Sequence, residues 1–239
     1  MGGEVRLGSM LFTLVEPHPG FEVAYNRWYE RDHFYAGCLV GPWLFAGRRW
    51  VATRDLKAQR RGAEVDRFGG RDLGSYLAVY WILDGHHDEH VDWALRQVRW
   101  LHANGRMFAE RDHVHTLLYR HRWTVAAEDG GVPAELALDH PFGGMTASLV
   151  RPGAGAGPEA LAAAVGDGAP LSIGFEPIPL PPDAPVSQQG LDGLDGTTMV
   201  LSFHEAAPPP PPAAADPTVL WTAPFIPTIP GTDRYTDRL

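Results

Sequence analysis

At positions 21–39 the chain reads FEVAYNRWYERDHFYAGCL, and this stretch decides how the rest of the sequence is interpreted. Residues three and four apart are neighbours on a helix, so an apolar stripe at that spacing predicts one amphipathic helix over 21–39. Its hydrogen-bonding and aromatic side chains gather on or near one side: Tyr25, Trp28, Tyr29, Asp32 and His33. Such a face can pack on a sheet and can also line a pocket with polar groups.

Strand and helix patterns alternate on both sides of this stretch. Apolar, aromatic or β-branched runs that end at turn residues predict four strands, at 10–16, 44–53, 75–83 and 113–126. A second amphipathic helix is expected at 90–108, and the charged, glycine-rich segment 54–74 is expected to be a loop. The order strand-helix-strand, twice over, is that of the split βαβ or ferredoxin-like fold. We therefore predict an α+β, ferredoxin-like domain over residues 1–127.

Residues 128–239 repeat this order in a weaker form. Strands are expected at 144–151, 171–178, 197–204 and 219–227, with a short alanine-rich helix at 157–165. A loop is expected at 179–196, and a proline-rich run at 206–215 stands where a second helix would be, because consecutive prolines cannot continue a helix. We predict a degenerate second ferredoxin-like copy that ends in a polar C-terminal arm.

Two such copies can associate in two ways. They either close a barrel within one chain, as a pseudo-dimeric monomer, or leave the first sheet to pair with its mate in a homodimer. The sequence leaves both arrangements open.

The composition restricts the classes of protein to be considered. A net charge of −9 argues against a nucleic-acid partner. No apolar run approaches the roughly 20 residues that span a bilayer, and the first residues lack the pattern of a signal peptide. A single cysteine, Cys38, excludes an internal disulfide and a cysteine-based zinc site. We expect a cytoplasmic protein with no membrane partner.

Residues 26–33, NRWYERDH, resemble the first-helix signature N-x-W-Y-x-x-x-H of the EthD-like branch of the dimeric α+β barrel superfamily. The segment 45–50, FAGRRW, is similar to the second strand of that family, and the resemblance covers the first half of the chain. It implies that two ferredoxin-like sheets pack into a barrel and that each unit keeps an apolar, aromatic cavity between sheet and helices. Known members include cofactor-free cyclases, isomerases, decarboxylases and monooxygenases acting on aromatic or polyketide-like compounds, and members without known activity are common.

His33 is the first candidate for a catalytic residue. An imidazole titrates near neutral pH and can move a proton on or off a bound compound. Tyr29 lies one turn earlier and is expected to face the same cavity, where its hydroxyl could polarise a carbonyl or phenolate oxygen. Asp32 could orient an imidazole or act as a base. The residues expected to contact the substrate beside them are Tyr25, Asn26 and Trp28. In the alternative interpretation these side chains, Trp28 above all, simply support the interface between helix and sheet.

Alternation along the strand at 113–126 places His113, His115 and His121 on one face. We expect His113 and His115 to contact a substrate if that face points into the cavity. If it points outward they are solvated, and periodicity cannot distinguish the two cases.

The sequence GHHDEH at 85–90 holds a further group of histidines. His86 and His90 have the i,i+4 spacing that can bind a metal on a helix. Asp88 and Glu89, however, are residues that a helix N-terminus attracts for its dipole. We interpret the group as a polar first turn and expect no metal site.

Our leading hypothesis is a cofactor-independent small-molecule enzyme. It would bind an apolar aromatic or polycyclic compound between helix and sheet. Proton transfer by His33, aided by Tyr29 or Asp32, would then drive a lyase, isomerase, cyclase or oxygenase step. The sequence has no P-loop and no G-x-S-x-G motif. The alternative is a non-catalytic ligand-binding or structural protein, and a second alternative is a haem-dependent barrel enzyme with a histidine ligand.

Overall fold

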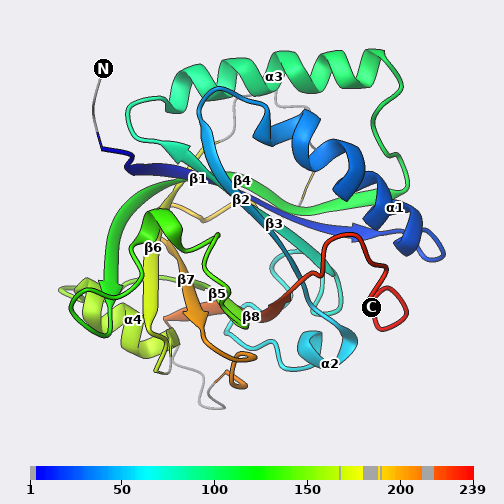
Figure 1. Ribbon diagram of the computed structural model, residues 1–239. Helices are drawn as coiled ribbons and strands as arrows, with labels where there is room; N and C mark the ends of the chain where they lie inside the picture. Colours follow the sequence, from blue (N-terminus) through cyan, green and yellow to red (C-terminus); the bar gives the residue numbers. More distant parts are fainter. Residues whose placement is uncertain (1–3, 167, 180–187, 189, 212–217) are drawn as a thin grey trace.

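Eight antiparallel strands close into one barrel, in the order β1-β3-β2-β8-β5-β7-β6-β4 (Figure 1). The structure, a computed structural model, describes residues 4–166, 168–179, 188, 190–211 and 218–239. The strands are β1 (Leu7–Pro17), β2 (Leu44–Val51), β3 (Tyr76–Leu83), β4 (Arg111–Ala126), β5 (Gly144–Val150), β6 (Leu171–Ile178), β7 (Thr198–His204) and β8 (Val219–Pro227). The helices are α1 (Glu22–Trp28), the π-helix η1 (Tyr29–Leu39), α2 (Arg54–Lys57), α3 (His87–Ala103), the 3-10 turn η2 (Ala134–Leu136) and α4 (Pro158–Gly166). The chain is therefore an α+β protein built on a closed barrel.

Every strand expected from the sequence is present, with ends within a few residues of those expected. The helix expected at 90–108 is α3, which begins and ends earlier, and the segment 54–74 is not entirely a loop because it contains α2. Residues 206–211 of the proline-rich run form no helix. The rest of that run to 215, and half of the loop expected at 179–196, lie outside the described residues.

The strand order of the first half, β4-β1-β3-β2, recurs in the second half as β8-β5-β7-β6. Two seams join the halves. Along one, β4 pairs with β6 from Leu118 to Ala126. Along the other, β2 and β8 share two residue pairs, Trp50 with Pro227 and Val51 with Ile226. Of the two arrangements that the sequence leaves open, the barrel closed within one chain is the one found.

Apolar side chains fill the barrel interior. Met10 and Phe12 of β1 point inward and are fully buried, because alternate residues of a strand face opposite sides of the sheet. On β3, the Trp81 indole donates a hydrogen bond to the Ala134 carbonyl at 3.0 Å. Its ring centroid lies 5.6 Å from that of Phe175 on β6. Since β6 belongs to the second half, the two halves share one core.

The helices lie outside this barrel. Figure 1 shows α1 and α3 across the sheet of β1 to β4, and α4 beside the second half. The outward side chains of β3, including Tyr80 and Ile82, pack with Tyr25 and Tyr29 of the first helical segment. Among the described helices, none combines the length and the apolar character that crossing a membrane requires.

Replacing Phe175 by alanine should lower the free energy of unfolding by about 3–5 kcal/mol, because it removes a buried ring from the core that the halves share. Urea unfolding followed by circular dichroism and by tryptophan fluorescence measures this loss, and the two signals should give one transition. In the control Phe21→Ala the ring is already 42% exposed, so the loss should be below about 1 kcal/mol. Two separate transitions would contradict a shared core.

Candidate ligand-binding site

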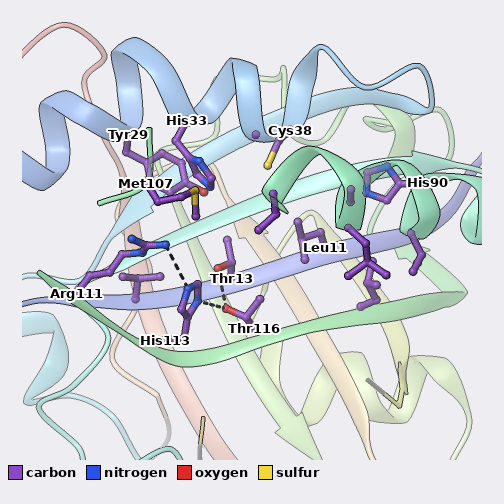
Figure 2. A pocket seen from close by; sticks show the side chains of 17 residues that line it. Leu11, Thr13, Tyr29, His33, Cys38, His90, Met107, Arg111, His113 and Thr116 are labelled. Atoms are coloured by element: carbon purple, nitrogen blue, oxygen red, sulfur yellow. Dashed lines mark hydrogen bonds between the residues drawn. The ribbon is translucent and has the colours of Figure 1, made fainter. Parts of the chain in front are cut away.

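A cavity of about 190 Å³ lies between the helices and the outer face of the sheet. Outward-pointing residues of β1 and β4 form its floor, and η1 and α3 form its roof (Figure 2). Most of the wall is apolar, including Leu11, Val15, Val91, Leu95, Val98 and Leu118. The polar side chains in it are Thr13, Tyr29, His33, His90, Arg111, His113 and Thr116. The cavity thus combines an apolar body with a few groups able to hydrogen-bond a ligand.

A change of helix type builds one wall of this cavity. The segment 21–39 is α-helical only to Trp28 and continues as the π-helix η1, in which the Val40 amide donates to the Tyr35 carbonyl at 3.1 Å. Nine residues of an α-helix make about two and a half turns, so Tyr29 and Cys38 would face opposite sides. The wider π turn brings both to the cavity. The expectation of one regular helix is therefore wrong in this half of the segment.

His33 lines the cavity as a neutral imidazole. Its ring stacks on the Trp28 indole with centroids 4.5 Å apart and meets the Tyr29 ring edge-on at 5.3 Å. Gly37 leaves room for the ring, since a Cβ there would lie 2.6 Å from the His33 Cε1. Burial, assisted by the charge of Arg111, lowers the pKa of His33 to about 3. Within the described part of the chain, its buried Nδ1 has no hydrogen-bond partner.

Tyr29 and Asp32 differ in their access to the cavity. Tyr29 lines it, but its hydroxyl lies 3.0 Å from the Tyr80 hydroxyl, and burial raises the pKa of Tyr29 well above its ordinary value. Asp32 accepts a hydrogen bond from the Arg106 Nε at 3.1 Å and borders a separate surface groove. That bond holds the pKa of Asp32 below its ordinary value. Asp32 is therefore bound to Arg106 and does not line the cavity.

Tyr25 and Trp28 lie behind the cavity wall. Tyr25 is buried against Tyr76, with ring centroids 5.4 Å apart. The Trp28 Nε1 donates to the Arg106 carbonyl at 2.9 Å, and the face of the indole supports His33. Neither residue is among those that line the cavity. Their expected contact with substrate stays a prediction, and Trp28 has the packing role considered as its alternative.

Asn26 joins the first helix to the rest of the fold. Its Oδ1 accepts a hydrogen bond from the buried Arg49 guanidinium at 2.8 Å, and its Nδ2 donates to the Thr232 carbonyl at 2.9 Å. Arg49 also contacts the Glu30 carboxylate at 3.1 Å. The polar C-terminal arm expected from the sequence is thereby held against α1. Asn26 is not part of the cavity wall, and its expected role in substrate binding stays a prediction.

A β-bulge separates the two strand histidines. Leu14 pairs with His115 and Val15 with His113, so Val114 is an extra residue in β4. His113 consequently lines the cavity, whereas His115 is fully buried on the other side of the sheet. The expectation that both share one face is wrong, because the bulge interrupts the alternation on which it depends.

His113 and Arg111 form a polar end of the cavity (Figure 2). The His113 Nδ1 lies 2.9 Å from the Thr116 hydroxyl, and its Nε2 lies 3.5 Å from a guanidinium nitrogen of Arg111. Burial lowers the pKa of His113 to about 4, and the charge of Arg111 adds to this effect. The Thr116 hydroxyl lies 2.8 Å from that of Thr13. A line of hydrogen-bonding side chains therefore crosses the floor from Arg111 to Thr13.

His90 is a cavity residue that the sequence analysis does not identify. It is buried in the wall contributed by α3, and burial lowers its pKa to about 4. Its Nδ1 has no hydrogen-bond partner among the described residues. His86, four residues before His90, precedes α3, and its ring stacks on that of Trp43 with centroids 3.9 Å apart. The available signal is that His90 lies four residues before Ala94, on the apolar stripe of the helix.

A groove of about 650 Å³ adjoins the cavity on the outside. The two spaces share Val98, Met107, Arg111 and His113. The end of α3 and the segment 105–109 form the remaining walls of the groove. A ligand with one end in the cavity can therefore extend past Arg111 and His113 toward the surface.

No protein-family model matches this chain, and a search of curated proteins finds no significant match. The resemblance to the EthD-like branch accordingly stays a prediction from residues 26–33 and 45–50.

The buried histidines should make the folded state less stable in mild acid. Burial puts the pKa of His33 near 3 and that of His113 near 4, below the ordinary value of 6.5, so the unfolded chain binds protons first as the pH falls. The free energy of unfolding should therefore decrease from about pH 6.5 toward pH 4, by up to about 1.4 kcal/mol per pH unit for each such histidine.

Urea unfolding at several pH values in this range measures the slope. His33→Phe keeps a ring but cannot titrate, so its slope should be shallower by up to about 1.4 kcal/mol per pH unit. Changing the exposed His102 to phenylalanine should give the same slope as the wild type. If His33→Phe showed the same dependence of unfolding free energy on pH as the wild type, burial would not be what holds this imidazole neutral.

Proposed function

We propose that this chain is a cofactor-independent enzyme that binds a small apolar, aromatic or polyketide-like compound in the cavity and transfers a proton there through His33. One observation carries the proposal. In a largely apolar cavity stands a neutral imidazole whose Nδ1 has no hydrogen-bond partner within the described residues. Leaving a buried polar atom unpaired costs about 1–3 kcal/mol, so this imidazole has hydrogen-bonding capacity that the described residues leave unused.

The size of the cavity supports a compact ligand. A protein cavity of roughly 150 Å³ holds benzene, so a space of about 190 Å³ suits one or two fused rings. A larger polycyclic compound would occupy the adjoining groove as well, which has about 650 Å³. The haem-dependent alternative would need the groove as well, because a haem is larger than the roughly 190 Å³ of the cavity.

A neutral imidazole can accept a proton from an acidic C–H or O–H group of a bound compound. The charge of Arg111 and the burial of the site both oppose its protonation. The anion left on the ligand would offset this opposition by pairing with the new imidazolium. His113, hydrogen-bonded to Thr116, is the second group in the wall able to carry a proton. Such steps belong to isomerase, lyase, cyclase and cofactor-free oxygenase reactions. Tyr29 would position His33 through the edge-on contact between their rings.

Non-catalytic ligand binding is the second candidate function, and the low pKa of His33 favours it. A group with a pKa of about 3 is a weak base near neutral pH, although it remains a good hydrogen-bond partner. The same cavity would then store, sense or carry its ligand. Measured proton transfer distinguishes the two candidates.

We also propose that the halves 1–127 and 128–239 are ferredoxin-like copies and that the chain is a single-chain counterpart of the dimeric α+β barrels. The recurrence of one strand order in both halves supports this relationship. So does the presence of a cavity between sheet and helices in the first half. On this view the chain acts as a pseudo-dimeric monomer in the cytoplasm.

A thermal-shift screen against small aromatic and polycyclic compounds should yield ligands that stabilise the protein. A ligand at 100 times its dissociation constant adds about 2.7 kcal/mol to the free energy of unfolding. Each ligand is then incubated with the protein in deuterated water, and mass spectrometry follows deuterium uptake at its acidic C–H groups. The wild type should exchange at least about 100-fold faster than His33→Ala, as expected for loss of a general base.

Two variants serve as controls for this experiment. Ala94→Phe fills the cavity and should abolish both binding and exchange, whereas His140→Ala, at a residue that lines neither the cavity nor the groove, should change neither. Equal exchange rates in wild type and His33→Ala would reject catalysis by His33 and leave the binding function. Absence of any stabilising ligand would reject the site itself.

A further inference from the structure

Arg111 is the one charged side chain among the described residues that line the cavity, and it also borders the outer groove. It is the first residue of β4 and is partly buried, and this burial lowers the pKa of its guanidinium. A guanidinium withdrawn from water requires compensation by an anion or by hydrogen bonds.

The protein supplies little of that compensation. The guanidinium lies 5.0 Å from the centroid of the Trp28 ring, and one nitrogen lies 3.5 Å from the His113 Nε2. No carboxylate forms an ion pair with Arg111 among the described residues. The neighbouring acid Asp112 is exposed and pairs with His18 at 3.3 Å.

Three other arginines near α1 and η1 form ion pairs. Arg49 binds Glu30, Arg106 binds Asp32 and Arg27 binds Asp233. Among these side chains, Arg111 alone faces the cavity. An unbalanced positive charge therefore stands where the cavity opens into the groove.

We propose that Arg111 binds a carboxylate group of the ligand, so that the site takes small aryl carboxylates with the ring in the cavity and the carboxylate at its mouth. The inference rests on the proposed function and names its substrate class. A carboxylate carries the single negative charge that balances one guanidinium, and its two oxygens match the paired N–H donors of arginine. A phosphate carries about two charges at neutral pH and would find neutral His33 and His113 beside Arg111.

The same placement would assist proton transfer. Arg111 is one of the groups that lower the pKa of His33. A carboxylate at Arg111 adds negative charge near the imidazole and offsets that effect, so His33 becomes a stronger base when substrate is bound. The substrate would thus supply part of the electrostatic environment that its own reaction needs.

Isothermal titration calorimetry, which measures affinity, tests this inference with matched pairs of an acid and its amide. The probes are phenylacetate with phenylacetamide and 2-naphthoate with 2-naphthamide, which have nearly the same shape but differ in charge. The wild type should bind the better acid at least about tenfold more tightly than its amide, as expected for a charge-assisted hydrogen bond. In Arg111→Gln this preference should vanish, while the affinity for the amide changes less than about twofold.

Two further variants keep the test decisive. Arg120→Gln changes an exposed arginine of the same strand and should retain the wild-type preference. Arg111→Lys keeps the charge without the paired donors and should retain part of the preference for the acid. It replaces Arg111→Gln in the experiment if that variant does not fold. Equal affinity of the wild type for acid and amide would overturn the inference while leaving ligand binding in the cavity intact. Binding of neither member of either pair would overturn the inference, and failure of the wider aromatic screen would be needed to reject the proposed function.

Discussion

Closure of the barrel is the constraint on which the rest of the structure depends. A closed sheet leaves no strand edge unpaired, and a barrel of eight strands is narrow enough for side chains to fill its interior. Trp50, Trp81 and Trp221 are all buried there. With the interior occupied, room for a ligand remains on the outer face of the sheet, where η1 and α3 stand over β1 and β4. The site therefore follows from how the core is packed.

Burial then sets the chemistry of that site. Exclusion of water keeps His33 and His113 neutral, and Arg111 strengthens this effect through its charge. Trp28 connects the two ends of this arrangement. The His33 ring stacks on its indole with centroids 4.5 Å apart, and the Arg111 guanidinium lies 5.0 Å from the centroid of the same indole. An indole that does not line the cavity thus contacts both an imidazole and a cation that do.

The sequence predicts the positions of the strands well because each is an apolar run bounded by turn residues, as at 171–178. Helical spacing also groups Tyr29 with His33, and both residues line the cavity. It does not predict the bulge at Val114, which arises from pairing with β1 and has no periodic signal of its own. The charge balance of Arg111 is equally hidden, because it depends on residues that distant parts of the chain bring together.

The seam between β2 and β8 has a consequence for how this barrel moves. Two residue pairs hold it, and the chain after β8, which ends in the C-terminal arm at 230–239, reinforces it. The Thr228 amide donates to the Arg49 carbonyl at 3.2 Å, and the Arg54 amide donates to the Arg238 carbonyl at 2.7 Å. Detachment of the arm would let the barrel open locally at this seam while the long β4–β6 seam stays closed. Amide hydrogens along the seam would then exchange with solvent through a partial opening, well before global unfolding. The opened edge would also be free to pair with a strand of another molecule.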